Sequence, residues 1–302
     1  MEIRKVGLIG LGAVGMNFGE HLLDAGADLL VIADEGRIAR FKEEGVYSNG
    51  KKIEFTYASP KEAQEVDLLL IATKIGGLRG AMETAAPFIG AHTLLVCLIN
   101  GITSESLLAE RFGGENVLYS VAQGMDAVKV GNQLTYTNSG RIVLGEKEPG
   151  PVSARVQAVA DYLNSHGVTC QPVEDMVRRQ WGKLMLNVGL NQACMVFEGD
   201  YSAVQKPGRA RDTMLGAMRE AQTLAALEGF AISEAEFDEW VAMVDGLAPE
   251  GKPSMRQDGE AHRKSEVELF ADTMIRLGEK HGVPVPVNRW LYESVMEMEA
   301  AY

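Results

Sequence analysis

The first half of the chain alternates short, continuous apolar runs with segments of helical periodicity. The apolar runs are Lys5–Ile9, Leu29–Ala33, Asp67–Thr73, Thr93–Leu98 and Val117–Val121, and helix-like stretches such as Gly77–Pro87 and Ser104–Arg111 lie between them. Continuous apolar strands are typical of a parallel sheet that is covered by helices on both faces. The pattern therefore predicts a doubly wound α/β sheet in this half of the chain.

The pattern of apolar and polar residues changes between Val128 and Gly145. Glycines there separate short pieces rich in Thr and Val, which predict antiparallel strands or hairpins. Pro149-Gly150-Pro151 then breaks the chain, and a helix to about Ser165 and a short strand near Val168–Gln171 are expected after it.

From Pro172 onward the pattern is helical. Helices are expected at Glu174–Phe197, Arg209–Gly229, Glu234–Leu247, Ala261–His281 and Val287–Ala300, with Gly and Pro clusters between them. We therefore expect an α/β domain over residues 1–171 and an all-helical domain over residues 172–302.

Composition narrows the class of protein. The 302 residues carry a formal net charge of −13, which argues against nucleic acid or an anionic membrane as the main partner. Cys97, Cys170 and Cys194 are odd in number and widely spaced, so they indicate neither a disulfide framework nor a metal site. No apolar segment approaches the roughly 20 residues of a membrane span, and the N-terminus lacks a signal-peptide pattern. A cytoplasmic protein without a metal is expected.

One predicted helix carries an unusual polar stripe. In Trp181–Asn191 (WGKLMLNVGLN), Lys183, Asn187 and Asn191 recur every fourth residue, and each step of four advances about 40° around a helix. The three side chains therefore share one face of a helix that is otherwise apolar. A buried stripe of this kind needs polar partners. By itself it is also compatible with a lysine that reaches solvent and two asparagines that satisfy backbone groups.

A glycine pattern follows the first apolar run. In Gly10-Leu11-Gly12-Ala13-Val14-Gly15, the first glycine permits a tight turn and the second lets the backbone approach a pyrophosphate. The third glycine lets helix and strand pack closely, and the helix N-terminus faces the anion. Because the pattern lies between a strand and a helix and a second strand follows, it predicts a Rossmann-type dinucleotide site.

The end of the second strand bears on the choice of dinucleotide. Asp34 lies about twenty residues past the glycines, where a carboxylate can accept hydrogen bonds from ribose hydroxyls and would repel a 2′-phosphate. Arg37, Arg40 and Lys74 provide cations nearby that could instead hold a 2′-phosphate. The pattern favours NADH slightly and leaves NADPH open. Arg37 and Arg40 are also compatible with a solvated helix face.

Three further polar positions have both a functional and an ordinary interpretation. Asn100, beyond the strand Thr93–Leu98, could bind the nicotinamide side of a cofactor, although Asn-Gly is also a common type I′ turn. Ser254 could be an N-cap of the following helix, and Glu266 could be a surface acid. For each position taken alone, the ordinary interpretation is favoured.

Taken together and in this order, the motifs resemble the ketopantoate reductase family, also called 2-dehydropantoate 2-reductases. The matching pieces are GLGAVG at Gly10–Gly15, Thr73-Lys74, Asn100-Gly101, WGKLMLNVGLN at Trp181–Asn191, Ser254-Met255 and Ser265-Glu266. The resemblance covers nearly the whole chain. It implies an N-terminal Rossmann domain, an all-helical C-terminal domain and reduction of a 2-oxo acid with NADPH or NADH.

The resemblance also implies roles for single residues. Lys183 matches the general acid, and Glu266 matches the glutamate that contacts substrate and organises that lysine. Substrate-contacting positions match Asn187, Asn191 and Ser254, and cofactor-side positions match Lys74 and Asn100. Lys183 would protonate the alkoxide that hydride transfer produces, while the asparagines and the serine hydroxyl would donate hydrogen bonds to the substrate.

Several positions depart from the family pattern. Asp34 stands where NADPH-dependent members often have arginine, and Ile99 stands where the residue before Asn-Gly is often glutamine. A further substrate-side asparagine of some members is replaced here by Tyr201. These departures leave the choice of dinucleotide and of 2-oxo acid open.

Two other activities are compatible with the same motifs. One is a related 2-hydroxyacid or opine-type dehydrogenase that takes another oxo acid, and the other is a non-catalytic dinucleotide-sensing protein. The expected partners are a small 2-oxo acid and a second copy of the chain. Such a homodimer would form through the helical domain, where Met243, Leu247, Leu291 and Met296 are apolar candidates for the contact.

Overall fold

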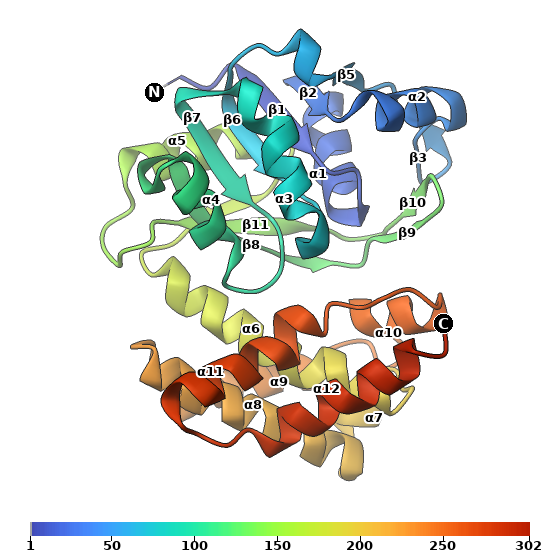
Figure 1. The fold of residues 1–302 in the computed structure, drawn as a ribbon, viewed down its shortest axis with the longest axis vertical. Coiled ribbons are helices and arrows are strands. Elements are labelled where there is room, and N and C mark those ends of the chain that lie inside the picture. The colour runs from blue at the N-terminus through green and yellow to red at the C-terminus, as the bar shows by residue number, and fades with distance from the viewer. Residues whose placement is uncertain (1) are drawn as a thin grey trace. The chain divides into compact units, whose positions relative to one another are not determined.

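A computed structural model describes residues 2–302 (Figure 1). The chain divides into two compact units, the first extending to Val177 and the second spanning Arg178–Tyr302. The boundary expected after Gln171 lies inside the short strand β12 (Cys170–Pro172) of the first unit.

An eight-stranded sheet forms the centre of the first unit, in the order β12-β11-β8-β7-β6-β1-β2-β5. Its strands are β1 (Lys5–Ile9), β2 (Asp28–Ile32), β5 (Thr56–Ala58), β6 (Val66–Ile71), β7 (Ile89–Cys97), β8 (Val117–Met125), β11 (Ser139–Gly145) and β12. All neighbours pair in parallel except β8 and β11. This parallel-dominated sheet confirms the predicted α/β class.

Helices cover the sheet because its central strands are apolar on both sides. The helices are α1 (Ala13–Asp24), α2 (Glu35–Glu44), α3 (Ile75–Ala85), α4 (Ser104–Phe112) and α5 (Ala154–Ser165). Phe18 and Leu22 of α1 and Leu163 of α5 share one buried cluster with Leu8 and Leu70 of the strands. Figure 1 shows α3 and α4 in front of the sheet.

A second, small sheet has the order β4-β3-β10-β9. Its strands are β3 (Tyr47–Ser48), β4 (Lys51–Lys52), β9 (Val128–Val130) and β10 (Gln133–Thr135). The β9–β10 pair is antiparallel, as expected for the Val128–Gly145 segment. Buried Glu20 of α1 holds this sheet, since it accepts hydrogen bonds from Ser48 Oγ at 2.5 Å and from the Tyr136 hydroxyl at 3.0 Å.

The second unit is helical. Its elements are α6 (Met176–Val196), α7 (Ser202–Gln205), α8 (Arg209–Leu227), α9 (Glu234–Asp245), α10 (Ser254–Glu260), the π-helix η4 (Glu268–Asp272), α11 (Thr273–His281) and α12 (Pro286–Glu299). α6 forms much of its core, because two glycines let neighbours approach closely. A Cβ on Gly182 would lie 2.6 Å from Trp240 Nε1, and one on Gly189 would lie 2.5 Å from Met218 Cγ.

The prediction of one continuous helix over Ala261–His281 is wrong for its first third, because residues 261–267 are not helical. α10 begins earlier, at Ser254, and ends at Glu260, and the regular α-helix resumes only at Thr273. His262 adopts a φ of 49°, a left-handed conformation that interrupts a helix. A hydrogen bond to a distant residue stabilises the interrupted segment, since Ser265 N donates to Glu299 Oε1 at 2.7 Å.

Two further observations concern possible partners. Leu291, one of the four apolar residues considered for dimer contact, is fully buried inside its own unit and cannot serve, whereas Met243 and Met296 are 45% and 42% exposed. Within residues 2–302, no helix combines the length and apolarity needed to cross a bilayer.

Candidate functional site

The glycine turn lies between β1 and α1 and is shaped by close backbone contacts. Gly10 has a φ of 101°, and a Cβ there would lie 2.6 Å from the Ala72 carbonyl oxygen. A Cβ on Gly15 would lie 1.9 Å from the Gly10 carbonyl oxygen. A Cβ on Gly12 would meet only the Ala72 oxygen, at 3.7 Å. Gly10 and Gly15 are therefore required by the turn itself, while Gly12 keeps its outer surface open.

The surroundings of this turn fit a dinucleotide. Gly12 is the N-cap of α1 and has no side chain to bond the first amide groups of the helix, which leaves those N–H groups for an anion. Thr73 Oγ1, at the end of β6, is buried without a hydrogen-bond partner. A glycine turn with free space outside Gly12, next to a hydroxyl without a hydrogen-bond partner, is the geometry expected for binding a pyrophosphate and its sugar.

Asp34 follows β2 at the carboxyl edge of the sheet and is the N-cap of α2. Its Oδ1 accepts a hydrogen bond from the Arg37 backbone N–H at 2.8 Å, and its Oδ2 lies 3.3 Å from the Arg37 guanidinium. The local sequence thus fixes the carboxylate in place and pairs the nearest cation with it. The Asp34 side chain remains 51% exposed, so its oxygens can still accept bonds from a sugar.

Lys74 and Asn100 follow β6 and β7, which lie on the same side of β1 in the sheet. Lys74 is the N-cap of α3 and is exposed. Asn100 does not have a positive φ, whereas Gly101 has a φ of 97°. A type I′ turn needs positive φ at both central residues, so the turn interpretation of Asn100-Gly101 is excluded. The topology therefore brings all the cofactor-side candidates to one edge of the sheet.

The polar stripe on α6 is present in the second unit. Lys183 and Asn187 are half-buried, and Asn191 is 5% exposed. Asn191 Nδ2 donates to Asn187 Oδ1 at 3.2 Å. Asn191 Oδ1 accepts from Ser254 Oγ at 3.1 Å and from the Met255 backbone N–H at 3.2 Å. The structure thus joins Asn187, Asn191 and Ser254 in one hydrogen-bonded group.

Ser254 does not have the capping role considered for it. It is the first residue of α10, and the N-cap position belongs to Pro253, which has no capping side chain. Asn191 supplies the missing cap from α6, because its Oδ1 satisfies an amide group in the first turn. No sequence pattern indicated this contact, since the two residues are 64 positions apart.

Glu266 lies between α10 and η4, in the segment where the helix is interrupted, and is half-buried. Its backbone carbonyl accepts a hydrogen bond from Leu269 N at 2.9 Å. Glu266 therefore belongs to an ordered bend that begins the next helical element, rather than to the exposed face of a continuous helix.

Tyr201 is the N-cap of α7 and packs against Gly251. Its backbone N–H donates to the Gly251 carbonyl at 2.9 Å, and Gly251 has no side chain, which leaves room for the tyrosine ring. Burial raises the pKa of Tyr201 to about 12. Its phenol therefore stays protonated at neutral pH.

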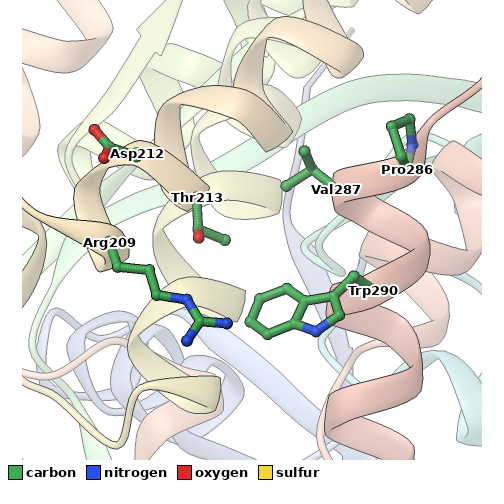
Figure 2. Close-up of a pocket in the computed structure, with 6 residues that line it drawn as sticks. All are labelled: Arg209, Asp212, Thr213, Pro286, Val287 and Trp290. Atoms are coloured by element: carbon green, nitrogen blue, oxygen red, sulfur yellow. The ribbon is translucent and has the colours of Figure 1, made fainter.

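A pocket of about 450 Å³ opens between α8 and α12 of the helical unit and was not expected from the sequence (Figure 2). Arg209, Asp212 and Thr213 line one side, and Pro286, Val287 and Trp290 line the other. Figure 2 shows the Arg209 guanidinium beside the Trp290 indole, with 5.6 Å between the guanidinium carbon and the ring centroid. None of the residues of the polar stripe lines this pocket.

Among residues 2–302, no group of three or more His, Cys, Asp or Glu side chains is placed to hold a metal ion. The three cysteines are buried and unbridged. Burial raises the pKa of each thiol to about 12, so none of them is a thiolate at neutral pH.

Comparisons with known proteins extend over both units. The family model described as ketopantoate reductase PanE/ApbA matches residues 6–149, and its C-terminal model matches residues 175–299. A 2-dehydropantoate 2-reductase of Streptococcus pyogenes serotype M3 is 26% identical over 299 residues, covering 97% of each chain. One from Archaeoglobus fulgidus is 24% identical, covering 99% of each.

Solved structures agree with this assignment. The 2-dehydropantoate 2-reductase of Geobacter metallireducens superposes with a TM-score of 0.85 at 25% identity, covering 97% of this chain and 99% of its own. A D-mandelate dehydrogenase solved with NADH and anilino(oxo)acetate has the same fold, with a TM-score of 0.87 at 24% identity and 98% coverage of both chains. With both family models matched in order and the fold shared, the chain belongs to the ketopantoate reductase family.

Proposed function

We propose that the protein reduces 2-dehydropantoate to pantoate with a nicotinamide cofactor. The observation that carries this proposal is the stripe on α6, where half-buried Lys183 shares one helix face with Asn187 and Asn191, which are joined to Ser254 by hydrogen bonds. This arrangement sets one ammonium donor beside neutral hydrogen-bonding groups. It suits a substrate that has both a ketone and other polar groups.

A bound nicotinamide cofactor would supply hydride to the ketone carbon of the substrate. Gly10, Gly12 and Gly15 would hold its pyrophosphate at the N-terminus of α1, with Thr73 as an additional donor. Leu11, Ala13 and Val14 complete that turn. Asp34 would accept bonds from the adenosine ribose, and Asn100 would lie on the nicotinamide side.

Lys183 would act at the ketone oxygen. As the carbonyl carbon gains hydride, negative charge develops on that oxygen, and an ammonium group stabilises it and then transfers a proton to it. The products are the 2-hydroxy acid, the oxidised cofactor and a neutral lysine, which regains its proton from solvent. Glu266 would hold Lys183 in position for this step.

We also infer a preference for NADH over NADPH. Asp34 is fixed by its capping bond to α2, and Arg37 is paired with it. A 2′-phosphate at this place would meet a fixed carboxylate, and Arg37 would have to leave its partner to bind the phosphate. The solved D-mandelate dehydrogenase of the same fold was obtained with NADH.

A homodimer stays a prediction. A relative from Staphylococcus aureus is described as dimeric. Of the four apolar residues considered for this contact, Met243 and Met296 are exposed. Sedimentation equilibrium would measure the state of association directly.

The test is steady-state kinetics with 2-dehydropantoate and a panel of other 2-oxo acids, using NADH and NADPH in turn. We expect 2-dehydropantoate to have the highest kcat/KM and NADH to be preferred. Asp34→Ser should reduce the preference by roughly tenfold, because it removes a ribose acceptor and a source of repulsion. Equal kcat/KM for both cofactors in the unsubstituted protein would contradict the role of Asp34.

A further inference from the structure

The helical segment that follows Glu266 contains an irregular turn. Residues Glu268–Asp272 form the π-helix η4, in which the Asp272 N–H donates to the Val267 carbonyl, five positions earlier, at 3.2 Å. A turn of this kind contains one more residue than an α-helical turn and is frequent at functional sites. One additional residue rotates the preceding chain by about 100° relative to the helix that follows. The turn therefore contributes to the direction in which Glu266 points.

A glutamine of α6 forms a hydrogen bond to the middle of this turn. Gln192 Oε1 accepts from the Ala271 backbone N–H at 3.0 Å. Both residues are fully buried, so water cannot replace the bond, and a buried amide group without a partner is destabilising. The bond from Gln192 thus stabilises the wide turn.

The other end of the Gln192 amide is also fixed. Its Nε2 donates to the Val188 carbonyl at 2.7 Å and to Asn288 Oδ1 of α12 at 3.3 Å. Asn288 is oriented in turn by the Glu220 carboxylate, which accepts from the Asn288 backbone N–H at 2.9 Å and from its Nδ2 at 2.8 Å. Because a carboxylate only accepts, Asn288 Oδ1 must face Gln192, and the Gln192 oxygen must face Ala271.

Gln192 lies away from the polar stripe of its own helix. It follows Lys183 by nine positions, which places the two side chains on opposite faces of α6 at about 100° per residue. The Gln192 side chain is fully buried, so no substrate can reach it. Gln192 can therefore influence the reaction only through the elements that it joins.

We propose that Gln192 is a positioning residue that stabilises the π-turn and thereby keeps Glu266 in its place relative to Lys183. Glu266 lies two residues before η4, and Lys183 lies on the same helix as Gln192. The bond from Gln192 to Ala271 thus joins the segment that carries Glu266 to the helix that carries Lys183. This inference rests on the proposed function, because it assumes that Glu266 holds Lys183 in position.

Gln192→Met tests the proposal without adding a charge. Methionine has nearly the same length as glutamine, but its sulfur is only a weak acceptor and it has no donor. The wide turn should lose its support, and Glu266 should move. We expect the Ala271 amide to exchange its hydrogen about tenfold faster or more. We also expect kcat to fall roughly 10- to 100-fold, while the KM for NADH changes by less than about twofold.

Gln205→Met is the matched control. Gln205 is a half-buried glutamine of the same unit, and its Nε2 donates to the Val244 and Leu247 carbonyls at 3.0 and 2.8 Å. Its replacement also removes two amide hydrogen bonds, so the melting temperature should fall as it does in Gln192→Met. Because these bonds reach the end of α9 and not η4, kcat and hydrogen exchange at Ala271 should stay unchanged.

A double-mutant cycle with Glu266→Gln tests the route of the effect. Glu266→Gln alone should lower kcat, and Gln192→Met should cause little further loss in that background, since both changes act through one carboxylate. Losses that multiply would overturn the proposal, because Gln192 would then act on Lys183 by another route. An unchanged kcat in Gln192→Met, or unchanged exchange at Ala271, would overturn it as well.

A second variant replaces this test if Gln192→Met does not fold. Asn288→Leu keeps the bond between Gln192 and Ala271 but removes the side chain that orients the Gln192 amide. Hydrogen exchange at Ala271 and kcat should then change in the same directions as expected for Gln192→Met, by smaller factors. If neither quantity changes in the folded variant, the proposal is wrong.

These outcomes are separable from failure of the proposed function. If the unsubstituted protein reduces no 2-oxo acid, the proposed reaction is wrong. Hydrogen exchange measured by mass spectrometry on peptides that cover residues 265–273 would still decide whether Gln192 stabilises η4.

Discussion

The glycine turn of the first unit and the polar stripe of the second are built on different principles. The turn is made of backbone, and what matters there is the absence of side chains: a Cβ on Gly15 would lie 1.9 Å from a carbonyl oxygen. The stripe is made of side chains, and what matters is the direction of their hydrogen bonds. Asn191 has both a donor and an acceptor engaged before any substrate arrives.

This difference determines how each region tolerates change. A substitution in the turn acts through steric overlap and moves the backbone of β1, α1 and the neighbouring β6 together. A substitution in the stripe leaves the backbone of α6 in place, since the helix is held by apolar packing on its other faces. In the turn, a substitution that overlaps the backbone should therefore weaken both cofactor binding and folding. In the stripe, a substitution should change the chemical step and leave cofactor binding and folding unchanged.

The largest effect is expected for Lys183→Ala. We expect kcat to fall between about 100- and 10,000-fold, because the developing alkoxide loses its proton donor and its counter-charge. Cofactor affinity should stay within error, since Lys183 belongs to the second unit and the glycine turn to the first. Stopped-flow hydride transfer and cofactor fluorescence titration measure the two quantities separately.

The matched control for that variant is Lys206→Ala, which removes an exposed lysine from the same unit. Its kcat should be unchanged. Retention of full activity by Lys183→Ala would end the general-acid assignment, and a parallel loss of cofactor affinity would remove the distinction drawn between the two regions.

The next largest effects on cofactor affinity are expected for Gly15→Ala and Gly12→Ala in the turn. Gly15→Ala places a methyl group against the Gly10 carbonyl, so both stability and cofactor affinity should fall, the latter by roughly 10- to 100-fold. Gly12→Ala meets only ordinary van der Waals contact, at 3.7 Å. Its melting temperature should be unchanged, while the methyl group obstructs the pyrophosphate and weakens cofactor binding alone.

Calorimetric melting and isothermal titration with NADH test this pair. If Gly12→Ala binds NADH normally, the open side of the turn does not face the pyrophosphate. If Gly15→Ala melts normally, the close approach to Gly10 is not needed for folding, and the turn is less constrained than its geometry indicates.

The features that could be predicted from the sequence are those encoded within a few residues. Gly10–Gly15 specify a turn through local sterics, and the four-residue spacing of Lys183, Asn187 and Asn191 specifies a shared helix face. The apolar runs likewise determine the parallel sheet. In each case the relevant interaction is between residues close in the chain or between whole strands.

What could not be predicted depends on contacts between distant residues. The cap that Asn191 provides to α10 joins positions 64 apart, and nothing in either local sequence indicates it. The segment 261–267 has helical composition, yet His262 in its left-handed conformation and the bond from Ser265 to Glu299 hold it in another shape. Burial of Leu291 inside its own unit is equally a property of the packed helices.

The smallest effect is expected for the ion pair that joins α6 to α9. Arg178 on α6 forms two hydrogen bonds to Glu236 on α9, at 2.8 and 2.6 Å, and Ser233 adds bonds to the same carboxylate. The Arg178 guanidinium, followed by Ser233, lowers the pKa of Glu236 to about 2 from an ordinary value of 4.5. The charged form is therefore favoured in the folded state.

The sign of the pH dependence follows from that shift. Because the folded pKa lies below the unfolded one, the ion pair contributes fully above about pH 4.5, and its contribution is lost as pH falls toward 2. Arg178 is 44% exposed, so solvent screening limits the contribution to about 1 kcal/mol. Glu236→Gln should thus melt lower than the unsubstituted protein at pH 6, and the gap should close progressively below pH 4.5. Comparing the two proteins at each pH cancels the other carboxylates. A gap that stays constant with pH would show that Glu236 stabilises α9 through its uncharged bonds to Ser233 rather than through α6.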